Sequence, residues 1–173
     1  MTVVEVALRI VLAVVFVIAF ISKVHSRSAF GEFAGSLDDI GWIRRRWRST
    51  VAVLIPMLEA AVVVLLVGPA SVMFGFASGA VLLVAFTAIT GAEIAKGHRV
   101  RCRCFGAGAA PIGPAQIARN VVLLIASIAG LAIEPISHGS VSGARLVLAI
   151  GLAALAAVAL VRWDDLAYLL RAS

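Results

Sequence analysis

A run of 33 residues without a charged side chain, from Ala60 to Ala92, limits the possible folds of this chain more than any other feature. A membrane-spanning helix needs about 20 predominantly apolar residues. The run and the apolar residues before it are long enough for two spans, and Gly68 and Pro69 supply a turn signal between them. Hydrophobic residues make up 62% of the chain and charged residues 14%, against roughly 45–50% and about 25% in soluble domains. The sequence therefore predicts an integral membrane protein.

Apolar residues group into five segments, at about 3–22, 51–67, 72–92, 114–133 and 143–161. Backbone polar groups must be satisfied within the segment in lipid, so we expect helices rather than strands. The predicted fold is an all-α integral membrane protein, a bundle of four to five transmembrane helices. With 173 residues, one domain over 1–173 is expected.

The stretch between the first two spans, residues 23–49, is longer than a turn and amphipathic. Its apolar residues recur at intervals of three or four, namely Phe30, Phe33, Leu37, Ile40 and Ile43. This pattern favours a short interfacial helical segment, with Trp42 and Trp47 at the level of the lipid headgroups. The alternative is a polar connector with a few buried apolar residues.

Small residues recur every four positions in two of the predicted spans. They are Ser71, Gly75 and Gly79 in the third span and Ala149, Ala153 and Ala157 in the fifth. Such rows let helix backbones approach closely. They suit packing within one bundle, which we favour, or the contact face of an oligomer.

The distribution of basic residues predicts the orientation. Twelve of the 15 Lys and Arg residues lie in the stretch after the first span, in the loop after the third span or in the C-terminal tail. With five spans these regions share one side, so the positive-inside rule predicts an outside N-terminus and a cytoplasmic C-terminus in the plasma membrane. The first segment is expected to be a retained helix rather than a signal peptide. The net charge of +6 then comes from basic residues that flank the apolar segments and report orientation. Membrane lipid is an expected partner, and no nucleic-acid partner is expected.

The only two cysteines, Cys102 and Cys104, are separated by one residue and flanked by Arg101 and Arg103. Nearby positive charge favours the reactive thiolate. A disulfide that closes across one residue is strained and easily reduced, which suits a redox-active pair. The alternatives are two inert thiols, or a metal site with His98 that would lack a fourth protein ligand for zinc.

Two further charged residues are candidates for a site inside the membrane. Glu59 lies within the second span, three residues after Pro56, and a charge in a span is a functional candidate by default. The alternative is a structural carboxylate paired with Arg119 or Arg9. Arg119 is placed either to stabilise a thiolate or a quinone oxygen, or to reach the interface. Arg9 follows Glu5 by four residues, the spacing of an intrahelical ion pair.

Four stretches together resemble the MauE family of methylamine-utilisation membrane proteins, within the DoxX-like group. They are Phe20-Ile21-Ser22-Lys23, Pro56-Met57-Leu58-Glu59, Cys102-Arg103-Cys104-Phe105-Gly106 and Arg119-Asn120. The resemblance covers nearly the whole chain. It implies a role in maturation of the small subunit of methylamine dehydrogenase with a thioredoxin-like partner, and it implies that Cys102 and Cys104 are the redox pair. Arg103 stands where the resemblance leads us to expect glycine.

The leading functional hypothesis is a membrane thiol–disulfide oxidoreductase or electron conduit. One cysteine pair does not carry electrons across a bilayer alone, so a quinone or a partner protein would have to act as a second carrier. The first alternative is a non-enzymatic membrane anchor or assembly subunit. The second is a transporter of a small solute or metal, with Glu59 lining a cavity.

Overall fold

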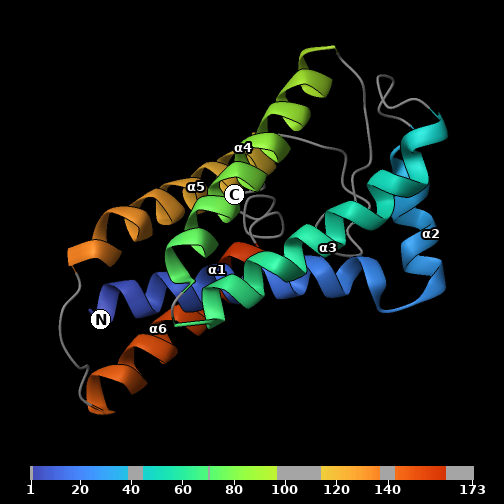
Figure 1. Ribbon diagram of the computed structural model, residues 1–173. Helices are drawn as coiled ribbons and strands as arrows, with labels where there is room; N and C mark the ends of the chain where they lie inside the picture. Colours follow the sequence, from blue (N-terminus) through green and yellow to red (C-terminus); the bar gives the residue numbers. More distant parts are fainter. Residues whose placement is uncertain (1, 39–44, 70, 97–113, 137–142, 163–173) are drawn as a thin grey trace, which may run out of the picture.

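The structure is a computed structural model and describes residues 2–38, 45–69, 71–96, 114–136 and 143–162. All secondary structure within these residues is helical (Figure 1). In chain order the elements are α1 (Val3–Val24), α2 (Arg27–Ser36), η1 (Arg45–Trp47), α3 (Arg48–Val67), α4 (Val72–Ala95), α5 (Pro114–Ile133), η2 (Glu134–Ile136) and α6 (Gly143–Val161). The predicted all-α fold is confirmed, and each predicted apolar segment corresponds to one of the five long helices.

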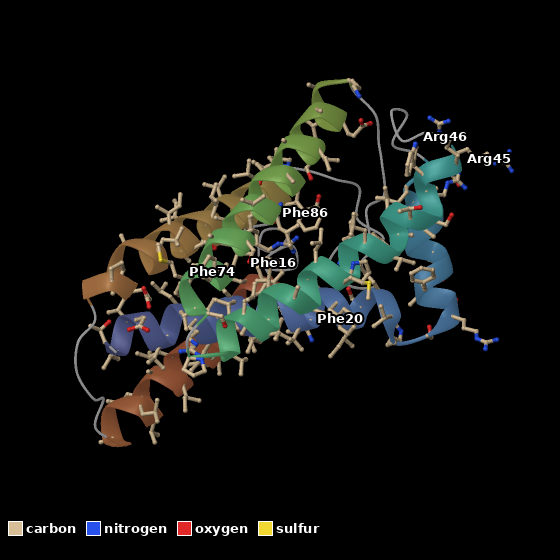
Figure 2. The ribbon with its side chains drawn as sticks, viewed as in Figure 1. Phe16, Phe20, Arg45, Arg46, Phe74 and Phe86 are labelled. Atoms are coloured by element: carbon tan, nitrogen blue, oxygen red, sulfur yellow. The ribbon has the colours of Figure 1, made fainter. Side chains whose placement is uncertain are left out.

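Four of these helices are long and apolar enough to cross a membrane: α1, α3 with the preceding η1, α4 and α5. The last helix, α6, contributes a shorter apolar stretch, Leu146–Val161. Large apolar side chains cover the outer surface, as with Phe74, which is 67% exposed on α4 (Figure 2). A surface of this kind suits lipid. The prediction of a multi-pass membrane protein with four to five spans is confirmed.

Long helices that follow one another in the chain, α1 with α3, α3 with α4 and α4 with α5, pack antiparallel, whereas α6 runs parallel to α1 (Figure 1). The first helix contacts α3, α5 and α6, while α4 packs against both α3 and α5 (Figure 1). Between α3 and α4, Gly75 lies against Leu66 and Gly79 against Val62, so the two helices run in opposite directions. The N-terminal ends of α3 and α5 and the C-terminal ends of α1 and α4 therefore lie toward one end of the bundle. We call it the basic end because Arg45, Arg46 and Lys96 lie there.

Bulky side chains fill the centre of the bundle. Phe16, Phe76, Leu83 and Leu123 are almost completely buried and come from three different helices. Figure 2 shows Phe16 on α1 in the middle of the helices. This apolar layer separates the N-terminal end of α1 from the buried polar residues that lie closer to the basic end.

The rows of small residues pack at helix–helix contacts inside the bundle. Gly75 and Gly79 are buried between α4 and its neighbours, and three alanines of α6 are buried in the same way: Ala149, Ala153 and Ala157. The extensive contact between α1 and α6 accounts for the alanine row. Close backbone approach needs such residues, so packing within one bundle, the interpretation favoured above, explains both rows.

We expect the Gly75→Ala variant to lower the free energy of unfolding by about 1–3 kcal/mol. A Cβ atom there would lie 2.8 Å from the backbone nitrogen of Leu66 and 2.9 Å from its side chain, so α3 and α4 would have to separate. Thermal unfolding in detergent measures the change. The matched control is Gly151→Ala, an exposed position on α6 with nothing within 4 Å, where no loss is expected. Equal losses at both positions would contradict the close approach.

The structure corrects the predicted ion pair between Glu5 and Arg9. Glu5 instead completes a capping box at the start of α1: Thr2 donates its backbone N–H to the carboxylate, and Glu5 donates its own to the Thr2 hydroxyl. Arg9 donates from Nε to the carbonyl of Leu66 and from Nη2 to the carbonyl of Val67 at 2.6 Å. The last carbonyls of a helix have no intrahelical partners, and lipid supplies no donor. Arg9 therefore supplies the hydrogen-bond donors that the carbonyls at the end of α3 need.

We expect the Arg9→Met variant to lose about 1.5–3 kcal/mol of stability, the usual contribution of hydrogen bonds from a charged donor. The α3–α4 turn would also become more accessible. Protease cleavage near Gly68 in detergent, together with thermal unfolding, measures both effects. A variant as stable and as protease-resistant as the parent would show that these bonds are dispensable.

The predicted interfacial segment forms α2 and the short η1 helix. Phe33 and Leu37 are buried in a small cluster with Ala52 of α3, which sets the segment against the bundle. The polar face of α2 is exposed, and Trp47 is 53% exposed at the start of α3. The remaining predicted members, Ile40, Trp42 and Ile43, lie outside the described residues.

Candidate functional site

An ion pair between two spans is completely buried inside the bundle. The Nζ atom of Lys23 donates to Glu59 Oε1 at 2.7 Å and to Oε2 at 3.1 Å, and both side chains are 0% exposed. The same Nζ atom donates to the backbone carbonyl of Ala19 at 3.0 Å. The three donors of the ammonium group therefore all have acceptors, which a buried charge requires.

Helix periodicity brings the two residues together. Lys23 lies in the last turn of α1, on the same face as the buried residues Leu12, Phe16 and Ala19. Glu59 lies in α3, one turn after Pro56, on the face that also buries Val62. Positions three or four apart share a helix face, so each charge extends a row of core residues rather than pointing to lipid.

Two further elements approach the pair. The Phe33 ring of α2 lies 5.5 Å from Lys23 Nζ, within the range of a cation–π contact. Arg119 of α5 lies close enough to act electrostatically on Lys23. Residues of α1, α2, α3 and α5 thus converge. We call Lys23, Glu59 and Arg119, together with Asn120, which follows Arg119 in α5 and is also buried, the buried polar cluster.

Arg119 and Asn120 occupy the buried face of α5, near its beginning. Both are almost fully buried, and the same face continues with Leu123 and Ser127. The Oδ1 atom of Asn120 has no hydrogen-bond partner among the described residues. A buried acceptor of this kind is rare in proteins.

Another buried carboxylate lies at the end of α4. Glu93 is 0% exposed and accepts from Lys96 Nζ at 2.9 Å, while the lysine side chain is 48% exposed. The third predicted span ended at Ala92, so the sequence interpretation left Glu93 outside the membrane helix, whereas α4 continues to Ala95. The helix ends that flank residues 97–113 therefore both carry buried charge, Glu93 on α4 and Arg119 on α5.

The structure corrects two predictions about charged residues. Lys23 was assigned to the basic loop after the first span, but α1 extends to Val24 and holds this side chain in the interior. The structural partner expected for Glu59 was Arg119 or Arg9, whereas the residue that contacts it is Lys23. The signal available in the sequence was the spacing of Lys23, which continues the apolar row of α1.

The structure locates two of the four predicted site residues. Glu59 and Arg119 belong to the same buried polar cluster, as described above. Cys102 and Cys104 lie outside the described residues, as does His98, the third residue of the alternative metal site.

The energetic cost of this cluster is considerable. An ionised side chain near the centre of a membrane helix costs about 2.5–3.5 kcal/mol, and the contact between Lys23 and Glu59 offsets part of that cost. Neither side chain is a redox group. The ion pair can hold α1 against α3. The positive charge of Arg119 lies near the start of α5, and the Glu59 carboxylate can accept a proton.

The fold and this cluster define a small multi-pass helical membrane protein with charged residues buried between its spans. The chain belongs to the MauE family, because the family model described as methylamine utilisation protein MauE matches residues 1–133. The match ends with the last residue of α5, so it includes the whole buried polar cluster.

A named relative agrees with this assignment. The methylamine utilization protein MauE of Paracoccus denitrificans is 35% identical over 126 residues, which cover 71% of this chain and 66% of that protein. The aligned part of the chain thus spans slightly less than two thirds of the relative's length. No solved structure matches the chain.

Proposed function

We propose that the protein exchanges electrons with a partner through reversible disulfide formation between Cys102 and Cys104, in the service of methylamine utilisation. The observation that carries the proposal is the buried charge at both helix ends that flank the cysteine segment. Glu93 lies near the end of α4 and Arg119 near the start of α5, and both are buried. Charged groups at such positions in membrane proteins usually serve a function.

The proposed chemistry is thiol–disulfide exchange. The thiolate of one cysteine attacks a sulfur of the partner's disulfide, and the displaced partner sulfur leaves as a thiolate that takes up a proton. The second cysteine, as thiolate, then attacks the mixed disulfide and releases the other partner sulfur. The protein's dithiol is oxidised and the partner's disulfide is reduced, with two electrons and two protons transferred. The reverse sequence oxidises a partner dithiol.

The partner we propose is a thioredoxin-like protein. Arg101 and Arg103 adjoin the cysteines in the sequence and favour the thiolate form. The relative named above is a methylamine utilization protein, which supports a role in methylamine utilisation. We propose that this role is the preparation of a disulfide-rich subunit of methylamine dehydrogenase. Within the cluster, Arg119 is proposed to stabilise negative charge on a reacting sulfur.

We propose a plasma-membrane location with the N-terminus outside and the C-terminus in the cytoplasm. Lys23 no longer counts as a loop charge because it is buried, yet eleven Lys and Arg residues remain in the regions assigned to the cytoplasmic side. The positive-inside rule then places the cysteine segment at the cytoplasmic face. A cytoplasmic thioredoxin would be its natural electron source.

Thiol labelling in intact cells tests both the chemistry and the orientation. A membrane-impermeant maleimide is applied to intact and lysed cells, with and without prior reduction. We expect labelling only after lysis, and stronger labelling after reduction. Labelling of intact cells would overturn the orientation but not the redox role. Cysteines that stay reduced in cells and under added oxidant would overturn the redox role.

A transporter is the less favoured alternative. It would need Glu59 to line a path for solute, but the carboxylate is 0% exposed and bound by Lys23. A non-enzymatic assembly subunit remains the main competitor. It differs from our proposal in one clear way, since it predicts normal maturation of the partner when both cysteines are replaced.

A further inference from the structure

Two exposed arginines and an exposed tryptophan lie together where the chain enters the second span. Arg45 and Arg46 belong to η1, which leads directly into α3, and both are exposed. Figure 2 shows them at the far end of α3, beside α2 and away from the centre of the bundle. The guanidinium carbon of Arg46 lies 5.7 Å from the centre of the Trp47 ring. We call Arg45, Arg46 and Trp47 the η1 patch.

The exposure of residues along α3 indicates that the η1 patch lies close to the lipid headgroups. The first strongly exposed apolar residue of α3 is Val53, six residues after Trp47, which is about 9 Å along a helix. The headgroup layer on each side of a bilayer is roughly 5–8 Å thick. When Val53 contacts the hydrocarbon, the patch therefore lies at or just above the headgroups, where tryptophan is enriched.

Within the part of the chain that the structure describes, neither arginine of the patch contacts a carboxylate. Arg45 and Arg46 form no ion pair with any residue in the described ranges, whereas the neighbouring Arg48 pairs with Asp38. The contact with Trp47 restrains Arg46 without reducing its charge. A guanidinium presents two parallel donors that match the oxygens of a phosphate group.

We propose that the η1 patch binds the phosphate headgroup of an anionic phospholipid. The two guanidiniums would hold the headgroup, and the indole of Trp47 would lie beside the glycerol region. Bound lipid would fix the start of α3 and the adjoining α2 at the membrane surface. The proposal does not depend on the cysteine chemistry.

Native mass spectrometry of the full chain in detergent tests the proposal. Dioleoyl phosphatidylglycerol is titrated against dioleoyl phosphatidylcholine, and we expect clear preference for the anionic lipid. The Arg45→Gln/Arg46→Gln variant should bind phosphatidylglycerol about 25-fold more weakly, because each arginine near an anionic surface contributes a factor of about five. The Arg45→Lys/Arg46→Lys variant keeps the charge and should lose less.

The matched control is Arg27→Gln/Arg162→Gln, which removes two exposed charges away from the patch. An equal loss of phosphatidylglycerol affinity in this variant would mean that only net charge matters. It would overturn the proposal of a lipid site at the η1 patch. Equal binding of phosphatidylcholine would overturn the preference for an anionic lipid. Displacement of the lipid by inorganic phosphate at equal concentration would mean that the patch binds free anions instead. Circular dichroism of each variant identifies any that fail to fold. If the Arg45→Gln/Arg46→Gln variant does not fold, the binding of the Arg45→Lys/Arg46→Lys variant is compared with that of the parent instead.

Discussion

Replacing Lys23 with Met is expected to lower the free energy of unfolding by about 3–5 kcal/mol. The substitution keeps much of the side-chain volume but leaves the Glu59 carboxylate buried without the cation that contacts it at 2.7 Å. A buried charge that loses its partner is among the most costly changes in a protein. The Glu59→Met variant should be destabilised to a similar extent for the converse reason. Unfolding in detergent, followed by circular dichroism, measures both.

The double variant Lys23→Met/Glu59→Met separates structure from function. Apolar residues of similar volume often replace a buried ion pair at little or no cost in stability, so we expect most of the lost stability to return. If the pair only holds α1 against α3, thiol–disulfide exchange returns as well. A stable double variant without exchange activity would assign the charges of the Lys23–Glu59 pair to the chemistry.

The control for this series is Lys96→Met. Lys96 also contacts a buried carboxylate, Glu93 at 2.9 Å, but its own side chain is 48% exposed. Because the lysine side of this pair is open to water, solvent screens the interaction, so we expect a smaller loss than at Lys23. Equal losses at Lys23 and Lys96 would contradict the importance of complete burial.

The second large effect is expected at the cysteines. Under the proposed function, the Cys102→Ser and Cys104→Ser variants each lose essentially all exchange with a thioredoxin-like partner, because one thiol attacks and the other resolves. The variant that lacks the resolving thiol should accumulate a mixed disulfide with the partner. Non-reducing electrophoresis of the purified complex detects this species, and its identity tells which cysteine attacks first.

Two controls accompany the cysteine series. Ser78→Ala changes a hydroxyl on α4 that donates to Phe74 within the same helix, and exchange should be unaffected. Arg103→Gly should keep exchange but slow it near neutral pH, because one of the two adjacent positive charges is lost. Normal maturation of the partner in the Cys102→Ser/Cys104→Ser double variant would reject the proposed chemistry and favour an assembly subunit.

Much of the fold could be predicted from the sequence. Lipid provides no hydrogen-bond partners for the backbone, so a long uncharged run such as Ala60–Ala92 has to be helical. The turn at Gly68 and Pro69 divides the run where α3 ends and α4 begins soon after. The sequence also predicts Glu59 as a site candidate, because a charge within a span is costly and is usually either paired or functional.

The partners of the charged residues could not be predicted in the same way. Arg9 has a carboxylate one turn before it, yet it donates to carbonyls of residues 66 and 67 because α1 and α3 are antiparallel neighbours. Lys23 lies at the end of its span, where a lysine ordinarily reaches the interface. Its side chain instead turns inward to Glu59, and only the crossing of α1 and α3 makes that contact available.

By itself, the sequence determined a multi-pass helical membrane protein of the MauE kind, with two adjacent cysteines next to basic residues. The helical membrane class follows from local composition, because the membrane limits each apolar segment separately, whereas the likeness to the MauE family rests on four short motifs. Only the tertiary structure decided that Lys23 and Glu59 form a buried ion pair, that Arg119 and Asn120 lie in the same cluster, and that Glu93 is buried at the end of α4. These facts depend on which helices are neighbours and in what register, and packing of the whole bundle sets both.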